Sequence, residues 1–114
     1  MTFDWTDIAV IELYASLFEH YAPLLSERQR EVLTSFLLDD LSLAEIAENL
    51  QISRQAVHEH LIKGCQELDG FEEKLGWCHK WQDLRQTLDE LETKYQGQKI
   101  AADLKEIKQK LDRM

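Results

Sequence analysis

The sequence predicts an all-α fold, in which a bundle containing a helix-turn-helix is followed by a long C-terminal helix and a tail. The 114 residues include one proline and four glycines, too few for the many turns of a strand-rich domain. Apolar residues recur at helical spacing, and serine opens three of the segments in the position of a helix cap. With 44% hydrophobic and 31% charged residues, the composition is that of a single globular domain.

The first expected helix covers residues 5–21 and carries enough apolar side chains to be largely buried. They are Ile8, Ile11, Leu13, Ala15, Leu17 and Phe18. The helix ends before Pro23, which disfavours helical geometry in the residue that precedes it. A second helix begins after Ser26, whose side chain can cap it while Gln29 completes a capping box.

A helix-turn-helix is expected in residues 42–68. Ser42 and Glu45 form another capping box before a short helix, and Ser53 caps the longer helix that follows. Ala47 offers the small side chain that two closely crossing helices need. The shared core is expected from Ile46, Leu50, Ile52, Val57 and Leu61, with Cys65 and Leu68 further along the same face.

Gln51 occupies the turn between these two helices, where helix-turn-helix proteins often have glycine. If the turn needs a left-handed backbone, a residue with a side chain costs about 1–2 kcal/mol there. The sequence therefore marks Gln51 as a position of expected strain.

Residues 70–96 are expected to form one long amphipathic helix after a bundle that spans residues 1–69. Large apolar residues recur there at alternating steps of four and three, as in a coiled coil. A bundle of this size is too small to cover the stripe, and exposed stripes are typical of association surfaces. We therefore expect a homodimer, with packing of the stripe back onto the bundle as the alternative. The expected dimer seam consists of Trp77, Trp81, Leu84, Leu88 and Leu91.

Residues 97–114 form an amphipathic basic tail in the same single domain. The apolar pattern breaks around Gly97, a candidate hinge, and resumes in a different phase. The tail is either a separate helix or a marginally ordered segment, because a helix of about 15 residues is barely stable alone. Its cations are the stretch of this chain best suited to RNA, although a solvated helix face is the favoured explanation for them. They are Lys99, Lys105, Lys108, Lys110 and Arg113.

The charge of the chain is concentrated in the part that holds the helix-turn-helix. Residues 1–73 contain 4 Lys or Arg and 15 Asp or Glu, a net charge of −11. Residues 74–114 contain 9 and 7, a net charge of +2, and the whole chain carries −9. Because duplex DNA is a dense polyanion, this distribution opposes DNA binding and favours a basic partner.

The face that the second helix of the motif turns outward is the candidate site for a nucleic acid or a protein partner. It is expected to consist of Arg54, Gln55, His58, Glu59 and Ile62. Arg54 and Gln55 could reach base edges in the usual docking geometry, whereas Glu59 would approach phosphates. In a DNA complex, phosphates would be held by Arg28, Arg30 and Lys63. Because this face has one permanent cation, binding of a protein partner is favoured over binding of duplex DNA.

No set of residues predicts catalysis, a cofactor or a metal site. His58 and His60 are two residues apart, which points them to different sides of a helix. The three capping serines are occupied, and no phosphate-binding glycine loop is present. Cys65 and Cys78 form no CxxC motif, so reduced thiols in a cytoplasmic protein are expected. No apolar run approaches the roughly 18 residues of a membrane-spanning helix.

The segments LLSERQREVL, LLDDLSLAEIAENLQISRQAVHEHL and FEEKLG, in this order and spacing, resemble the YlxM family of small bacterial proteins. The resemblance covers residues 13–76, and SLAEIA followed by ISRQAV is its most specific part. The same stretch is similar, more distantly, to the C-terminal promoter-recognition domain of bacterial sigma factors. The chain differs from the family in Gly64, where a basic residue is common, and in Gln51, where glycine is frequent; we expect both to weaken nucleic-acid binding.

The resemblance implies an all-helical fold related to that sigma-factor domain. Family members are encoded beside genes of the signal recognition particle pathway and are described as its regulators. This implies a regulatory protein that binds protein or ribonucleoprotein components of the particle. The alternative is a sequence-specific DNA-binding transcriptional regulator.

Overall fold

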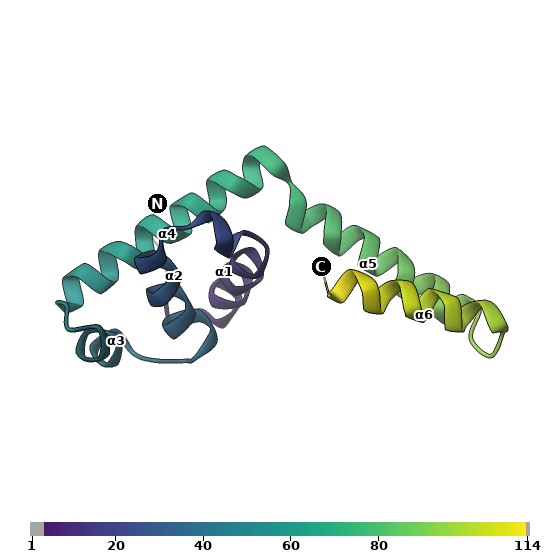
Figure 1. The fold of residues 1–114 in the computed structure, drawn as a ribbon, viewed down its shortest axis with the longest axis horizontal. Helices are drawn as coiled ribbons and strands as arrows, with labels where there is room; N and C mark the ends of the chain where they lie inside the picture. Colours follow the sequence, from purple (N-terminus) through teal and green to yellow (C-terminus); the bar gives the residue numbers. More distant parts are fainter. Residues whose placement is uncertain (1–3, 114) are drawn as a thin grey trace. The chain divides into compact units, whose positions relative to one another are not determined.

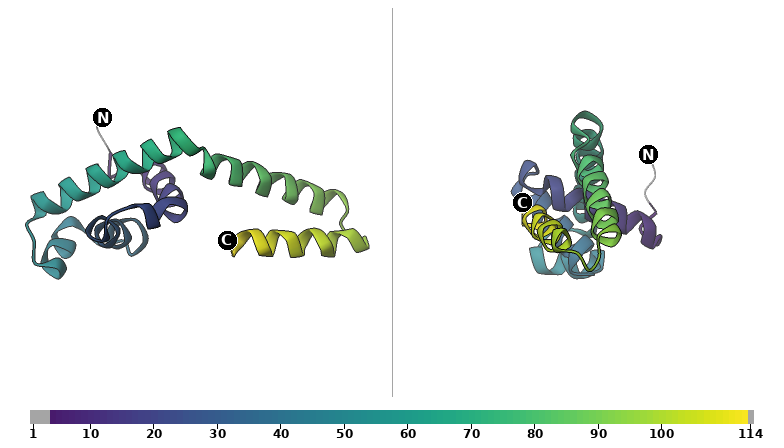
Figure 2. Two further views of the ribbon diagram at one scale, coloured as in Figure 1. Left: turned by 45° about the horizontal axis from the view of Figure 1, so that its top comes forward. Right: turned by 90° about the vertical axis from the view of Figure 1, so that its right-hand side faces the viewer.

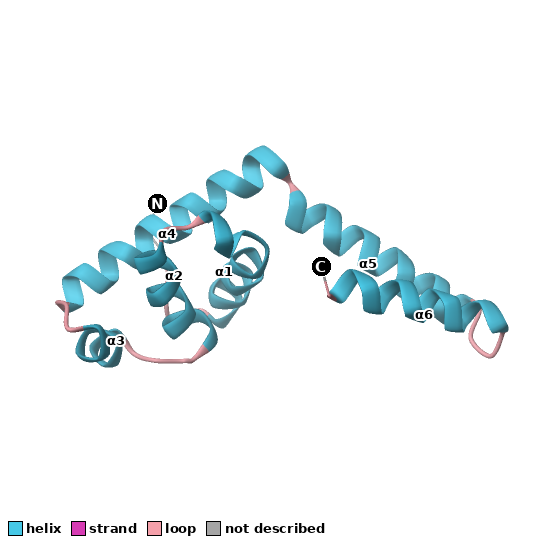
Figure 3. Ribbon diagram, in the orientation of Figure 1, coloured by secondary structure: helices cyan, strands magenta, loops and turns pink. Residues whose placement is uncertain are grey.

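The computed structural model describes residues 4–113, in which every regular element is a helix (Figures 1 and 3). The elements are α1 (Ile8–Tyr21), η1 (Ala22–Leu24), α2 (Glu27–Leu33), η2 (Thr34–Leu38), α3 (Leu43–Leu50), α4 (Arg54–Leu75), α5 (Trp77–Lys94) and α6 (Lys99–Asp112). The all-α prediction is confirmed. The chain divides into two compact units, residues 1–76 and residues 77–114.

Helix α4 is the central element of the first unit, and α1, α2 and α3 pack against it (Figure 1). Its inner face is a stripe of four side chains with no exposed surface: Val57, Leu61, Cys65 and Leu68. Val32 and Leu33 of α2 and Ile46 of α3 are equally buried. Full burial of a side chain of this size contributes roughly 1.5–3 kcal/mol. The core positions predicted for α4 are confirmed.

Serine caps begin three of the helices, as the sequence predicts. The Oγ atoms of Ser26, Ser42 and Ser53 accept hydrogen bonds from the backbone N–H groups three residues ahead, at 3.3, 3.1 and 3.0 Å. At Ser42 the Glu45 carboxylate also accepts from the Ser42 N–H at 3.1 Å, which completes a capping box. These hydrogen bonds lower the pKa of Glu45. The sequence also predicts a capping box between Ser26 and Gln29. The Gln29 side chain is instead buried in the first unit, with 4% of its surface exposed.

Helix α1 is less buried than the sequence suggests. It begins at Ile8, where the Asp7 carboxylate accepts from the Ala9 N–H at 2.9 Å, rather than at residue 5. Ile8 and Leu13 are 71% and 55% exposed, so the expectation of a largely buried helix is wrong. The reason is that α1 buries one face, which consists of Tyr14, Leu17, Phe18 and Tyr21.

Two tyrosines attach α1 to the C-terminal half of α4. The Tyr14 hydroxyl donates to Asp69 Oδ2 at 2.8 Å, and the Tyr21 hydroxyl donates to Glu72 Oε1 at 2.6 Å. Burial, together with Asp69, raises the pKa of Tyr14, so this hydroxyl remains a donor at neutral pH. Hydrogen bonds to a charged acceptor contribute about 1.5–3 kcal/mol each, which makes these contacts a substantial part of the α1 attachment.

Gly64 lies where α4 crosses α2. It is buried, and a Cβ atom built on it would come within 2.8 Å of Leu33 Cδ1. The absence of a side chain is therefore a packing requirement. The interpretation of Gly64 as a missing basic contact to nucleic acid is wrong, because this position faces the core.

Helix α4 extends past the boundary expected near residue 70. Gly70 lies inside the helix, and a Cβ there would meet no atom within 4 Å. The helix ends at Leu75, where Gly76 takes left-handed geometry with a φ of 58° and its N–H donates to the Glu72 carbonyl at 2.8 Å. Glycine is the residue that adopts this C-terminal geometry without strain, which explains why the break falls at Gly76.

The helix that begins at Glu27 changes from α to π geometry at Thr34, which no spacing in the sequence indicates. The Asp39 N–H closes the segment by donating to the Thr34 carbonyl at 3.1 Å. Phe36, within the π-helix, packs edge-on against the Trp5 ring, with centroids 5.3 Å apart. The π segment contacts α1, and the α-helical part before it contacts α4.

The second unit is an antiparallel hairpin, in which α6 runs back along α5 (Figure 2). The predicted basic tail is therefore a helix, and Gly97 lies in the turn with a φ of 83°. Leu88 of α5 and Leu104 of α6 are buried, with 6% and 9% of their surfaces exposed. The tail thus covers part of the apolar stripe that precedes it.

Ion pairs join the two helices of the hairpin. Arg85 pairs with Asp112, and Lys108 pairs with both Asp89 and Glu92, the latter with Nζ to Oε2 at 2.7 Å. The hydrogen bond from Lys108 lowers the pKa of Asp89, and the two carboxylates raise the pKa of Lys108. Lys108 is therefore engaged within the hairpin rather than available to RNA.

We predict that alanine at the two glycines of α4 has opposite effects. Gly70→Ala raises the free energy of unfolding by about 0.5–1 kcal/mol, because alanine favours helix and meets no neighbour. Gly64→Ala lowers it by about 1–2 kcal/mol, because overpacking against buried Leu33 exceeds the helix-propensity gain. Urea unfolding followed by circular dichroism measures both, and an equal stabilisation by the two variants would contradict the packing role of Gly64.

The Lys108 ion pairs should contribute to stability in a defined pH window. Because the pKa of Asp89 is lowered from 3.8, its contribution is complete above this value and is lost as the pH falls through the lowered pKa. Because the pKa of Lys108 is raised from 10.5, its contribution is complete below 10.5 and is lost as the pH rises through the raised pKa.

The melting temperature of Lys108→Met, compared with the wild-type chain across pH, measures this window. The deficit of the variant should be constant from about pH 5 to pH 9 and shrink at both extremes. Lys105→Met, at an exposed position of the same helix, is the control and should show no such window. A deficit that does not change with pH would refute the electrostatic origin.

Candidate partner-binding face

The turn of the helix-turn-helix ends α3 with two reciprocal hydrogen bonds. The Ile52 N–H donates to the Ala47 carbonyl at 3.1 Å, and the Gln51 N–H donates to the Glu48 carbonyl at 3.4 Å. This is a Schellman motif, in which the left-handed residue is usually glycine. Gln51 has a φ of 60° and a ψ of 41°, so the expected left-handed strain is present. The motif sets the direction in which α4 begins.

The five residues of the predicted outward face all lie on the N-terminal half of α4. Arg54, Gln55, His58 and Glu59 are exposed, and Ile62 is half-buried. At about 100° per residue, Gln55, His58, Glu59 and Ile62 lie along one flank of the helix, beside the buried stripe. Arg54, seven residues before Leu61, is nearly in line with the stripe and is exposed in the first turn of α4. The Gln55 amide donates to Glu59 Oε1 at 3.3 Å, which joins two of them. The face can therefore offer a carboxylate, an amide and one permanent cation to a partner.

One of the three cations expected to hold phosphates has an acidic partner. The Arg28 guanidinium pairs with Glu31 at 3.3 Å, and both side chains are 43% exposed. Arg30 lies on the same helix, and Lys63 is exposed on α4. The three cations thus lie on two helices, and one of them is engaged with a carboxylate.

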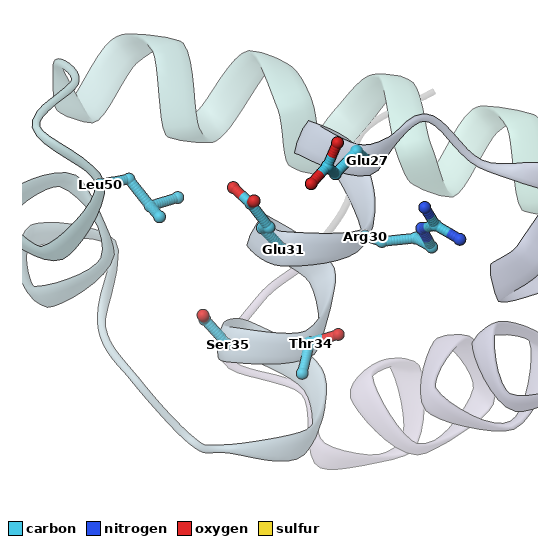
Figure 4. Close-up of a pocket in the computed structure, with 6 residues that line it drawn as sticks. All are labelled: Glu27, Arg30, Glu31, Thr34, Ser35 and Leu50. Carbon is cyan, nitrogen blue, oxygen red and sulfur yellow. The ribbon is translucent and has the colours of Figure 1, made fainter.

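A shallow groove of about 420 Å³ lies between α2 and the end of α3 (Figure 4). The carboxylates of Glu27 and Glu31 point toward the gap that separates α2 from Leu50 (Figure 4). Arg30 also lines the groove, with its guanidinium directed away from Leu50 (Figure 4). Thr34 and Ser35 complete the lining. The sequence gives no signal for this groove, because its residues come from separate elements that the fold brings together.

The net charge of the first unit is strongly negative. Residues 1–76 contain 5 Lys or Arg and 15 Asp or Glu, a net charge of −10, whereas residues 77–114 contain 8 and 7, a net charge of +1. The outward face of α4 therefore belongs to a unit whose long-range field repels polyanions and attracts cations.

The residues of the expected dimer seam lie on α5 but do not share one environment. Trp77 and Leu84 are 53% and 50% exposed, Trp81 and Leu91 are half-buried, and Leu88 is buried. The difference arises because α6 packs along α5 and occupies part of the stripe.

Both cysteines of the described residues are free and buried. Burial raises the pKa of the Cys65 thiol to about 12, which keeps it protonated and unsuited to nucleophilic chemistry. Across residues 4–113, no group of three or more His, Cys, Asp or Glu side chains is arranged to hold a metal ion. In the same range, no helix has the length and apolarity needed to cross a membrane.

These features define a small, acidic, all-helical helix-turn-helix protein. A family model described as "Putative helix-turn-helix protein, YlxM / p13 like" matches residues 11–109. The match covers most of the chain, so the protein belongs to this family, UPF0122.

Curated relatives agree with this assignment. The UPF0122 protein STH1464 of Symbiobacterium thermophilum is 43% identical over 82 residues, which cover 72% of this chain and 77% of the relative. A UPF0122 protein of Lactococcus lactis subsp. cremoris (strain MG1363) is 41% identical over 82% of this chain and 86% of its own length. The resemblance predicted from the sequence is confirmed.

We predict that glycine relieves the strain in the turn. Gln51→Gly should raise the free energy of unfolding by about 0.5–1 kcal/mol, because the left-handed penalty of about 1–2 kcal/mol exceeds the added entropy cost of glycine. Asn49→Gly, at an exposed position inside α3, is the control and should destabilise by about 0.3 kcal/mol, the difference in helix propensity between the two residues. Thermal unfolding measures both, and loss of stability in Gln51→Gly would contradict the strain.

Proposed function

We propose that this protein regulates the signal recognition particle pathway in the cytoplasm, by binding a protein or ribonucleoprotein partner through the outward face of α4. The pathway comes from the resemblance to the YlxM family. The mode of action rests on charge: a face with one permanent cation, in a unit of net charge −10, suits a basic partner. The proposed role is binding and includes no catalysis.

The composition of the face supports a protein partner. Arg54 and His58 offer hydrogen-bond donors, Glu59 offers an acceptor, and half-buried Ile62 offers an apolar contact. The acidic groove beside Leu50 adds carboxylates that could receive Lys or Arg side chains. The targeting GTPase of the particle and its receptor are the partners to test first.

Affinity capture of the tagged chain from its native cell, with and without nuclease, tests this function. Capture of the particle GTPase that survives nuclease is expected for a protein contact, and capture lost on nuclease treatment indicates contact through RNA. Recovery of neither particle GTPase nor its receptor in either condition would contradict the proposed pathway.

A pair of charge reversals on α4 tests the face itself. Glu59→Lys should abolish capture, whereas Glu73→Lys, the same change at an exposed position near the other end of α4, should leave it intact. Equal loss in both variants would indicate that total charge, rather than this face, determines binding.

Sequence-specific binding of duplex DNA is the second candidate function, because Arg54 and Gln55 are exposed at the start of α4. If this function holds, binding weakens steeply between about 50 and 200 mM salt and is largely lost in Arg54→Ala. Absence of a complex with genomic fragments at low salt would exclude it.

A further inference from the structure

The two-helix hairpin of residues 77–114 has one charged flank. Arg85 pairs with Asp112, and Lys108 pairs with Asp89 and Glu92, so these contacts close the hairpin along one side. The same pairs set the register of the two antiparallel helices.

The opposite flank of the hairpin is apolar and exposed. Leu84 of α5 is 50% exposed, and Ile100 and Ile107 of α6 are 46% and 50% exposed. Leu91 lies one heptad after Leu84 and is half-buried. Each helix of the hairpin therefore carries an apolar stripe at coiled-coil spacing. The part of the stripe that faces the other helix is buried, and the part on the flank is exposed.

We propose that two copies of the chain associate through these apolar flanks to form an antiparallel four-helix bundle, in which α5 of one copy packs against α6 of the other. In such a bundle each helix has a neighbour from its own hairpin and one from the second hairpin. Leu84, Leu91 and Ile107 then line the core between the copies. This inference does not depend on the proposed function.

Charge at the edge of the apolar flank selects this arrangement. Lys94 lies nine residues after Arg85 on α5, and Asp103 lies nine residues before Asp112 on α6. Nine residues are about two and a half helical turns, so both side chains are on the opposite side of the hairpin from the Arg85–Asp112 pair, and at matching heights. Both are exposed. In the proposed bundle, Lys94 of each copy faces Asp103 of the other, and the pair forms twice.

The size and net charge of the hairpin also favour a second copy of the chain as the partner that covers its exposed apolar flank. Residues 77–114 form a unit shorter than about 40 residues, a length at which stability usually requires a disulfide, a metal or association. Among its described residues, the buried side chains are Cys78, Leu88 and Leu104. A net charge of +1, from 8 cations and 7 anions, produces little repulsion between two hairpins.

The proposed interface differs from the five-residue seam that the sequence suggests. Leu88 is buried within the hairpin, and Trp81 lies beneath the Arg85 guanidinium, 5.8 Å from ring centroid to Cζ, on the side of the charged flank. The contact between copies moves to Leu84, Leu91, Ile100 and Ile107.

Analytical ultracentrifugation of the full chain at tens of micromolar tests the association. The wild-type chain should sediment at twice its 13.4 kDa mass. Ile107→Asp should weaken dimerisation at least about a hundredfold, because it places a charge in the apolar core between copies. Ile8→Asp, which alters an exposed isoleucine of the first unit, should remain dimeric. A monomeric wild-type chain, or a dimeric Ile107→Asp that retains its helical circular dichroism, would overturn the proposal.

Charge exchange tests the pairing of α5 with α6. Lys94→Asp and Asp103→Lys should each weaken the homodimer about tenfold, since two attractive edge pairs become repulsive. The double variant should regain wild-type affinity, because the pairs are restored with reversed polarity. A double variant as weak as the single variants would rule out this arrangement. Glu90→Lys, at an exposed position of α5 outside the proposed interface, should have no such effect.

Discussion

The buried stripe of α4 is the constraint on which the rest of the first unit depends. Val57, Leu61, Cys65 and Leu68 have no exposed surface, and three other helices pack against the element that carries them. Gly64 allows α2 to approach this stripe closely. Because a helix repeats every 3.6 residues, fixing the inner positions also fixes which residues face outward. Packing thus orients the face that includes Arg54 and His58 before any partner is present.

Charge determines what such a face can bind. A helix-turn-helix frame with a basic surface is suited to DNA, whereas the same frame in a unit of net charge −10 repels phosphates at long range. The two proposals assign different roles to the two units. In the proposed function the acidic unit binds a basic partner, and in the proposed dimer the nearly neutral hairpin meets a copy of itself with little repulsion.

Features that depend on local spacing could be predicted from the sequence, and features that depend on three-dimensional neighbours could not. The serine caps, the buried positions of α4 and the strain at Gln51 are local, and the structure confirms them. The close approach at Gly64, the bond from Tyr14 to Asp69 and the acidic groove join residues distant in sequence. The helical period predicts which residues of α4 face outward. It does not indicate which partner these residues would bind. The packing of α6 against α5 also joins separate segments and could not be predicted from local spacing.

Nuclear magnetic resonance of the isotope-labelled chain, titrated with the purified targeting GTPase of the particle, tests the central claim most directly. We expect amide shift changes concentrated in residues 54–62 and around the groove at Leu50, with little change in residues 77–114. Changes confined to residues 77–114, or no changes at a large excess of the GTPase, would contradict it. Equal changes on adding duplex DNA at about 0.15 M salt, where exposed charges beyond about 8 Å are screened, would show that the face reads nucleic acid instead.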